Sequence, residues 1–457
     1  MTTDPAQSSS RPSRHGPLHG LGIGWRPELA AFIADRSDLS FVEVIAETLP
    51  AHRPLPAGLD RLVERGIPVI AHGVGLGLGG ADPLQPTRVA QLAAIADRVR
   101  APIVSEHVAF VRAAGLEAGH LLPVPRTRDA LDVLVANVRA VCAELPVPLA
   151  LEHPAALLRW ADAEFGDAEF LTELVERTDA LLLLDLANLH ADRINHGVDP
   201  HRFLAALPWE RIAYIHVAGG IERAGLYHDT HTHPITREVL TLLRECTDRH
   251  RASVAVMLER DGRYPSVQEL TDELDAIITA AAGPASPTAG AMPCRTALTN
   301  RDGGVGTHAH THTHTDGRAR LHRTQDDLVR ALVAGGPTPA GFDPARVATT
   351  RTALLRKRAA ALARLWPALS CLPEFDSRFT AFATGRAPAG AHADGVAFAH
   401  EVRTELANDA RAEQLVAAVA GRRLAVAVDR RAGARPLLAV RAPFIGTRVL
   451  GRRHEGT

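Results

Sequence analysis

The stretch Leu181-Leu-Leu-Leu-Asp-Leu-Ala-Asn188 is the clearest of several short apolar runs that end in a polar side chain. Four consecutive leucines lack the apolar–polar alternation of a strand with one solvent-exposed face. The run therefore predicts a strand buried on both faces, as in a parallel sheet. Seven further runs of this kind lie along the chain: Leu21–Gly24, Phe41–Ile45, Pro68–Ala71, Pro102–Ser105, Pro148–Leu151, Ile212–Ile215 and Ser253–Leu258.

Stretches with helical periodicity separate these runs, most clearly Pro86–Arg100, Thr127–Leu145, Asp167–Thr178, Thr236–His250 and Ser266–Ala282. Ser266 followed by Glu269 has the pattern of a capping box at the start of a helix. Eight strand–helix units in roughly 265 residues match the size of a (β/α)8 TIM barrel, of class α/β. We therefore predict a TIM barrel over residues 19–283, with a doubly wound open sheet as the alternative.

The length of 457 residues favours more than one domain. The four cysteines, Cys142, Cys246, Cys294 and Cys371, show no C-x-x-C spacing. This spacing argues against a disulfide scaffold and against a thiolate zinc site, and it indicates a cytoplasmic protein. Residues 1–18 lack the apolar segment of a secretion signal and are expected to form a disordered tail. No apolar run has the length that a membrane-spanning helix needs.

The composition changes after the predicted barrel. Residues 284–317 are rich in Gly, Pro, Ala and Thr and predict a linker. The linker contains His308, His310, His312 and His314, which suggest either a solvated low-complexity tract or a metal-storage tract.

Residues 318–457 predict a separate, smaller and mainly helical domain. The expected helices are Leu321–Ala334, Ala345–Leu365 and Gly395–Ala420. Leu424–Val428 and Leu437–Val440 are expected to pair as a hairpin that turns near Gly433.

Charge is distributed unevenly along the chain. The whole chain has 51 Lys and Arg against 52 Asp and Glu, but from Arg318 onward the numbers are 23 and 12. The acidic barrel half suits cations and disfavours nucleic acid, which needs a basic surface. In the basic half, the clusters Arg356–Arg358, Arg422–Arg423 and Arg430–Arg431 suggest peptide docking. The alternatives are a solvated basic face and a genomic preference for Arg, since Lys357 is the only lysine.

Residues that bind metals or protons gather where the predicted strands end: His72, Glu106, His107, Glu152, His153, Asp185, Asn188, His216, Glu259 and Asp261. The loop after the seventh strand adds His228, Asp229, His231 and His233. The carboxyl ends of barrel strands meet at one face, where the active sites of TIM barrels lie. We therefore expect these side chains to converge.

So many acids and imidazoles in a small volume indicate bound cations, because a buried charge without a partner is costly. Imidazole and carboxylate without thiolate suit iron, manganese or zinc. About eight ligands exceed the need of one ion and favour two or three ions bridged by carboxylates. The predicted ligands are His72, His107, Glu152, Asp185, His216, Asp229, His231 and Glu259.

Other polar residues near the strand ends have simpler structural interpretations. His153, His190, His196, His228 and His233 are each individually more typical of hydrogen-bonded structural histidines. Asp261 is expected to pair with Arg260 or Arg263. Glu106 is a candidate for a hydrogen bond to the ring nitrogen of a ligand histidine that does not face the metal.

Nine motifs, in order, resemble the multinuclear non-heme iron-dependent oxidases (MNIO). They are Gly22-Ile-Gly-Trp-Arg-Pro27, Ala71-His-Gly-Val-Gly-Leu76, Ser105-Glu-His-Val108, Leu121-Leu-Pro-Val-Pro-Arg-Thr127, Leu184-Asp-Leu-Ala-Asn188, Asn195-His-Gly197, Ile215-His-Val-Ala-Gly219, Asp229-Thr-His231 and Leu258-Glu-Arg-Asp261. The resemblance covers most of residues 19–280, and nine motifs together are far more specific than one.

The resemblance implies a TIM barrel that holds two or three iron ions in mixed Fe(II)/Fe(III) states. It implies that dioxygen is the co-substrate and that the substrate is a Cys-containing, ribosomally made precursor peptide, which is modified by oxidation. By motif, it assigns the eight predicted ligands to iron and adds Asn188 as a ninth.

This chain departs from the family where Glu152-His153 replaces the usual Glu-Asn, and again near Glu47-Thr48. His153 is therefore a candidate for an extra ligand or a proton carrier, and we assign His153 and Glu106 as candidate catalytic residues. Members of the family often work with a separate peptide-binding protein. The domain of residues 318–457 is expected, by analogy, to be such a partner in fused form.

Two other function classes stay open on the sequence. Metal-dependent TIM-barrel isomerases and hydrolases or endonucleases also place His, Asp and Glu at strand ends. The acidic barrel half disfavours an endonuclease, and the absence of lysine from the barrel disfavours an isomerase. A metal-binding or storage protein that uses the His-rich linker is the non-enzymatic alternative.

Overall fold

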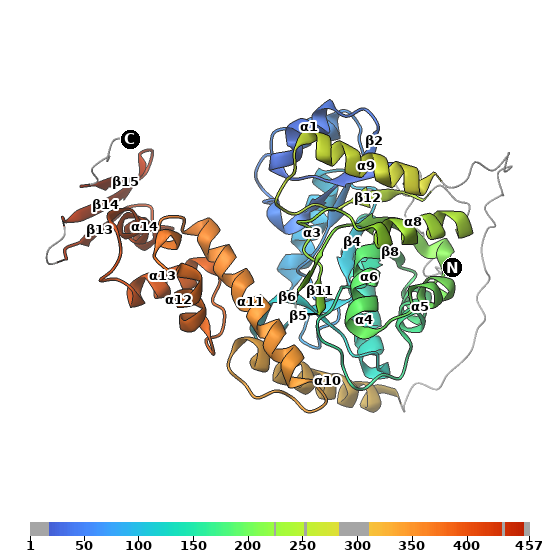
Figure 1. Cartoon of the computed structure of the whole chain (residues 1–457). Helices are drawn as coiled ribbons and strands as arrows, with labels where there is room; N and C mark the ends of the chain where they lie inside the picture. Colours follow the sequence, from blue (N-terminus) through green and yellow to red (C-terminus); the bar gives the residue numbers. More distant parts are fainter. Residues whose placement is uncertain (1–17, 224, 251–253, 283–309, 432–434, 452–457) are drawn as a thin grey trace, which may run out of the picture. The chain divides into compact units, whose positions relative to one another are not determined.

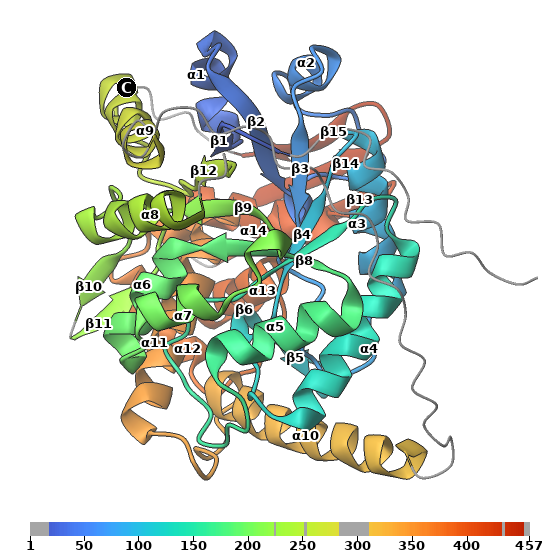
Figure 2. The ribbon, with the colours of Figure 1, turned by 90° about the vertical axis from the view of Figure 1, so that its right-hand side faces the viewer.

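The structure is a computed structural model, and it describes residues 18–223, 225–250, 254–282, 310–431 and 435–451. Eight parallel strands form a closed barrel in the order β1-β12-β9-β8-β7-β4-β3-β2 (Figures 1 and 2). Closure of all eight strands confirms the TIM barrel and excludes the open sheet. The described residues contain no helix long and apolar enough to cross a membrane.

Each barrel strand overlaps one of the predicted apolar runs. The strands are β1 Leu21–Gly24, β2 Leu39–Ile45, β3 Val69–His72, β4 Val104–His107, β7 Leu149–Glu152, β8 Leu181–Asp185, β9 Ile212–Val217 and β12 Val256–Leu258. Ser253, the predicted start of the last run, lies outside the described residues. Several strands extend one or two residues further than predicted, so the polar residues at their ends belong to the strands themselves.

Helices α1–α9 follow the strands of the barrel: α1 Ala30–Asp35, α2 Leu59–Glu64, α3 Pro86–Arg98, α4 Arg128–Glu144, α5 Asp167–Thr178, α6 Leu186–His196, α7 Pro200–Ala206, α8 Arg237–His250 and α9 Val267–Ala281. Short 3-10 turns lie at Pro27–Leu29, Ala46–Thr48 and Trp209–Arg211. The predicted capping box is present, because Glu269 N donates to Ser266 Oγ at 3.3 Å and Ser266 N donates to Glu269 Oε2 at 2.8 Å.

Two antiparallel hairpins are inserted after barrel strands and were not predicted. Strands β5 Ala109–Ala113 and β6 Leu116–Pro123 form one, and β10 Ile221–Arg223 and β11 Leu226–His228 form the other. The second hairpin leads directly into Asp229 and His231. It therefore places the loop that carries two of the predicted ligands.

Helix α10, His310–Val333, begins inside the stretch that was expected to be linker up to residue 317. Residues 284–309, including His308, lie outside the described residues. The first half of α10 packs against the barrel: Arg318 donates to Asn137 Oδ1 at 3.1 Å, and Gln325 Nε2 donates to the carbonyl of Gly79 at 2.8 Å. These contacts stabilise a helix that the local sequence alone favours only weakly.

By its internal contacts, the chain divides into two compact units, and the second comprises residues 115–120 and 326–457. In the C-terminal part this unit contains α11 Pro344–Leu365, α12 Phe375–Ala383, α13 Ala391–Glu401 and α14 Asn408–Val419, with a 3-10 turn at Leu369–Cys371. Strands β13 Ala425–Asp429, β14 Leu437–Ala442 and β15 Gly446–Leu450 form an antiparallel sheet.

The mainly helical character and the β13–β14 pairing were predicted, whereas α12 and β15 were not. Gly433 lies outside the described residues.

The single helix expected over Gly395–Ala420 is wrong, because the helix stops after Glu401 and resumes at Asn408. The break places Val402 and Leu406 in the apolar core of this unit, with Phe379 and Phe398. Burial of two apolar side chains in the turn outweighs the local preference for one continuous helix.

A buried ion pair joins helix α14 to strand β13 in this unit, and breaking it should destabilise the unit. Arg411 is 2% exposed, and its Nε donates to Asp429 Oδ2 at 2.9 Å. We expect Asp429→Asn to lower the free energy of unfolding by about 3 kcal/mol, because it leaves a buried guanidinium without its carboxylate. Calorimetry of the full chain would measure this, with exposed Asp327→Asn as the control. Equal unfolding of the two variants would contradict the prediction.

Candidate metal centre

The barrel interior consists of an apolar layer followed by a polar layer. Phe41, Ile70, Ile103, Ala150, Leu183, Tyr214 and Met257 form a buried cluster. Because side chains two residues apart on a strand point to the same face, the next inward residues belong to the polar layer. They are Glu43, His72, Ser105, Glu152, Asp185, His216 and Glu259, all at most 5% exposed.

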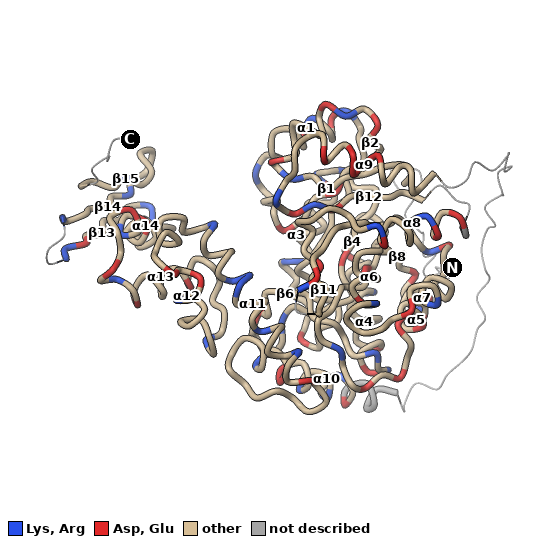
Figure 3. The backbone as a smooth tube through the Cα atoms, viewed as in Figure 1, with Lys and Arg blue, Asp and Glu red and all other residues tan. Residues whose placement is uncertain are grey.

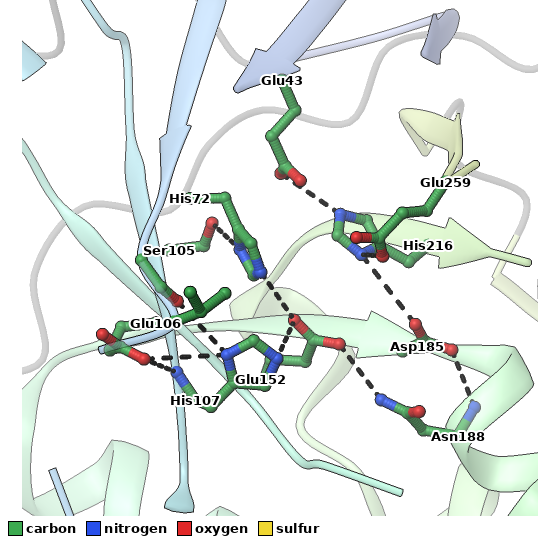
Figure 4. Close-up of polar contacts among 12 residues, drawn as sticks. Glu43, His72, Ser105, Glu106, His107, Glu152, Asp185, Asn188, His216 and Glu259 are labelled. Atoms are coloured by element: carbon green, nitrogen blue, oxygen red, sulfur yellow. Dashed lines mark hydrogen bonds and ion pairs between the residues drawn. The ribbon is translucent and has the colours of Figure 1, made fainter. Parts of the chain in front are cut away.

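Together with His107 and His231, residues of this layer form three groups that have the geometry to hold metal ions, and Figure 4 shows most of their members. The groups are His72, His107 and Glu152; then Glu152, Asp185 and His216; then Asp185, His231 and Glu259. The potential ligand atoms of each group lie within 4.8 Å of one another. Glu152 belongs to the first two groups and Asp185 to the last two, so two carboxylates join the three groups into a row.

The atoms that face the centre fit metal ligation. Glu152 Oε2 lies 3.3 Å from His107 Nε2 and 3.8 Å from His72 Nε2, and His216 Nδ1 lies 3.9 Å from Asp185 Oδ2. Glu152 Oε2 and Asp185 Oδ2 are buried and accept no hydrogen bond from the described residues. Because buried carboxylate oxygens rarely lack a hydrogen bond, these two oxygens favour a cation beside them.

The side chains of the centre titrate far from their ordinary ranges. Burial raises the pKa of Glu152 to about 8 and that of Asp185 to about 6. Burial also lowers the pKa of His72 to about 4. For His107, burial opposes the charged ring, but the charge of Glu152 and the bond with Glu106 raise its pKa to about 9. The metal-free centre therefore still holds protons at neutral pH.

Metal uptake should accordingly become tighter as the pH rises from 6 to 9. The pKa of metal-free His107 is about 9, so at lower pH this ring carries a proton that an incoming ion must displace. His72, with a pKa of about 4, is already neutral. Each displaced proton changes the affinity about tenfold per pH unit. Anaerobic Fe(II) titrations at several pH values would measure this slope. An affinity that does not vary with pH would contradict the prediction.

The two remaining predicted ligands, Asn188 and Asp229, stand beside the three groups. Asn188 Nδ2 donates to Glu152 Oε1 at 3.1 Å and to the carbonyl of His153 at 3.0 Å, which orients Glu152. Asp229 Oδ2 lies 2.6 Å from His231 Nε2. His231 has a φ of 51°, a left-handed conformation that is uncommon outside glycine and that marks strained functional loops.

The candidate catalytic residues Glu106 and His153 are placed differently from the metal ligands. Glu106 accepts from the backbone N–H groups of Leu76 and His107, at 2.9 and 2.8 Å, and its Oε1 lies 3.6 Å from His107 Nδ1. His153 follows Glu152 and therefore points out of the barrel. It lines a separate cavity of about 90 Å³, where its ring centroid lies 5.3 Å from that of Phe203.

The other histidines near the strand ends make structural contacts. The ring of His190 packs edge-on against Tyr227, His196 Nε2 lies 2.8 Å from the carbonyl of Ala156, and His233 Nδ1 lies 2.8 Å from Thr230 Oγ1. His228 ends strand β11.

Asp261 pairs with Arg26 rather than with Arg260 or Arg263, so that expectation was wrong. Arg26 Nε donates to Asp261 Oδ1 at 3.0 Å, and Asp261 Oδ2 also lies 3.3 Å from His231 Nδ1. Arg260 is bound instead to Glu273 at 2.6 Å. Residues that follow one another in a turn point in different directions, so sequence neighbours are poor guides to ion pairs.

The sequence analysis missed Glu43, which lies in the polar layer 3.2 Å from His216 Nε2. It also missed Ser105, whose Oγ lies 2.8 Å from His72 Nδ1. A signal for Glu43 was present, since a carboxylate in the middle of an apolar strand needs a buried partner. No such signal marked Ser105, because a serine in a strand is common.

Models of two protein families match the chain, one in the barrel and one in the C-terminal unit. The family model of the RiPP precursor modification enzymes MbnB/TglH/ChrH matches residues 20–282. A model of the SCO6045-like C-terminal domain matches residues 322–404. The matched boundaries follow the barrel and part of the helical unit.

Individual relatives and solved structures also match the chain. A UPF0276 protein of Streptomyces avermitilis is 43% identical over 419 residues, which cover 82% of this chain and 85% of that protein. A UPF0276 protein of Caulobacter vibrioides is 36% identical over 261 residues, 57% of this chain and 93% of its own length. The crystal structure of endonuclease IV from Thermus thermophilus is 19% identical, with a TM-score of 0.40, and covers 57% of this chain and 98% of its own.

Proposed function

Because this chain belongs to the family of RiPP precursor modification enzymes MbnB/TglH/ChrH, we propose that it uses iron and dioxygen to oxidise cysteine residues of a ribosomally made precursor peptide. The observation that carries the proposal is the row of three ligand groups joined by Glu152 and Asp185. Carboxylates shared between neighbouring groups are what a bridged cluster of two or three ions requires.

The donor set supports iron as the metal. Each group combines one or two imidazoles with one or two carboxylates and has no thiolate, which suits iron and leaves coordination positions open for substrate and dioxygen. Iron in this centre would supply dioxygen activation and a binding position for the cysteine sulfur.

The protein's own residues hold this centre in shape. Asn188 fixes one oxygen of Glu152 so that the other faces His72 and His107. Arg26 holds Asp261 and lies 3.7 Å from Glu259, which keeps the carboxylate next to His231 in place. In this proposal, Glu106 keeps His107 directed at the centre, and His153 carries protons or contacts the peptide from its own cavity.

Iron loading followed by exposure to dioxygen tests the proposal. The full chain would be loaded anaerobically with Fe(II) and then exposed to dioxygen with a Cys-containing precursor peptide encoded beside its gene. Mössbauer spectra report the iron states, and mass spectrometry reports the peptide. We expect two or three irons per chain and a mass change on a cysteine. Tightly bound zinc, or no oxygen uptake with an unmodified peptide, would reject the oxidase in favour of an isomerase, a hydrolase or a metal-binding protein.

For the C-terminal unit we propose peptide docking, supported by its basic charge (Figure 3). The predicted Arg clusters are only partly available, because Arg358 is bound to Asp394 and Arg431 to Asp429. Arg356, Lys357, Arg422, Arg423 and Arg430 are exposed. Of these, we select Arg356, Arg422 and Arg423 for the test.

Reversing the charge of Arg356, Arg422 and Arg423 to Glu should weaken binding of an acidic precursor peptide about tenfold, because several exposed charges together give about 1.4 kcal/mol. Fluorescence anisotropy at low and high salt would measure the affinity. Arg202→Glu, an exposed reversal in the barrel, serves as the control. Equal affinities in the triple variant and the control would contradict docking through this unit.

A further inference from the structure

A line of hydrogen bonds runs behind the metal centre and joins two of its histidines. His72 Nδ1 lies 2.8 Å from Ser105 Oγ, which lies 2.8 Å from the Tyr214 hydroxyl. That hydroxyl lies 2.6 Å from Glu43 Oε2, which in turn lies 3.2 Å from His216 Nε2. All five side chains are at most 2% exposed, and Figure 4 shows both ends of the line.

The chemistry of these groups gives the line a direction. An ionised carboxylate only accepts, so Glu43 receives the single proton of the Tyr214 hydroxyl and an N–H from His216. The Tyr214 oxygen, having donated its proton, accepts from the Ser105 hydroxyl. Ser105 Oγ then accepts from His72 Nδ1–H. Every donor in the line has an acceptor, and donation from both ends converges on the carboxylate of Glu43.

This direction determines which nitrogen of each ring stays free for a metal. An imidazole that binds a metal keeps one N–H at most, so the metal-binding nitrogen would be Nε2 in His72 and Nδ1 in His216. His72 Nε2 faces Glu152 Oε2 at 3.8 Å, in the first ligand group. His216 Nδ1 lies 3.9 Å from Asp185 Oδ2 of the second group and 3.2 Å from Glu259 Oε2 of the third group. Both free nitrogens therefore point into the centre.

We propose that Glu43, Tyr214 and Ser105 are positioning residues, and that the single carboxylate of Glu43 sets the tautomer and orientation of both His72 and His216. The inference rests on the proposed metal centre, and it adds the residues that couple two of its ligand groups. Partners behind a metal-bound imidazole fix its ring and commonly change metal affinity about 10- to 100-fold. Here one partner serves two rings that belong to different ligand groups.

Two substitutions separate the roles along the line. Glu43→Leu removes the acceptor at which the two donors meet, so we expect Fe(II) binding to weaken about 10- to 100-fold at both the first and the second group. Tyr214→Phe keeps the ring but frees the Ser105 hydroxyl to donate to His72, while the Glu43–His216 contact remains. This variant should lose affinity in the first group only.

The experiment is an anaerobic Fe(II) titration of the full chain, with thermal unfolding of the metal-free protein as the second measurement. Tyr264→Phe, the same change at a partly exposed tyrosine, is the matched control. A positioning role predicts weaker metal binding at an unfolding temperature close to that of the control. Unchanged affinity in both variants, or a loss fully explained by lower stability, overturns the proposal.

A failure of the proposed function is distinguishable from a failure of this inference. If the wild-type chain binds no metal, the oxidase proposal fails, but ring ¹⁵N shifts of the metal-free protein still report the tautomers. We expect Nδ1–H for His72 in the wild-type protein and the opposite tautomer, Nε2–H, at His72 in Tyr214→Phe. Unchanged tautomers in both variants would overturn the role of Glu43.

Discussion

Replacing Glu152 with Ala should remove two of the three ligand groups at once and abolish peptide oxidation. Glu152 Oε2 lies within 3.8 Å of both His72 and His107, and the same carboxylate belongs to the group of Asp185 and His216. We expect iron to fall to about one ion per chain, held by Asp185, His231 and Glu259. The rate of peptide modification should fall at least ~100-fold, since loss of a residue that only hydrogen-bonds to a ligand already costs about 10- to 100-fold.

Iron analysis and a peptide mass assay on the same preparation would measure both effects together. Glu144→Ala is the matched control, because Glu144 is an exposed carboxylate at the end of α4, outside the barrel interior. Normal iron loading with full activity in Glu152→Ala would reject the site assignment. Loss of iron with retained activity would separate the metal centre from the chemistry.

The barrel and most of its centre were predictable because burial in a parallel sheet leaves a readable pattern. Runs such as Leu181–Leu184 predict strands without a solvent-exposed face. A carboxylate or imidazole directly after such a run is easily recognised in the sequence. Six of the seven residues in the three ligand groups had been marked by this pattern, and the seventh, His231, had been predicted from the loop after the seventh strand. The restriction to iron came from the family resemblance, because imidazole and carboxylate ligands alone also suit manganese and zinc.

The features that could not be predicted depend on side-chain direction and on tertiary contacts. Glu152 and His153 are adjacent and equally polar, yet alternation along β7 sends one into the barrel and the other into a separate cavity. Tyr214 resembles any core aromatic until its hydroxyl is seen 2.6 Å from Glu43. The start of α10 at His310 depends on contacts with the barrel that no local pattern encodes.

Asp185→Asn should have an effect as large as that of Glu152→Ala, but at the other end of the row. Asp185 Oδ1 caps helix α6 by accepting from Asn188 N at 2.8 Å, and Asn is an equally good N-cap residue. The substitution therefore keeps the helix and removes only the charge shared by the second and third groups. We expect about one remaining iron, held by His72, His107 and Glu152, and a loss of activity of at least ~100-fold.

The two variants together test the order of the groups. The iron that remains in Asp185→Asn should have two imidazole ligands, whereas the iron that remains in Glu152→Ala should have one, from His231. X-ray absorption spectra resolve that difference through imidazole scattering, and Mössbauer spectra should show two distinct iron environments. If both variants kept the same iron environment, the three groups could not be separate members of one bridged row. If Asp185→Asn unfolded while Glu152→Ala did not, the α6 cap rather than the metal charge would explain the loss.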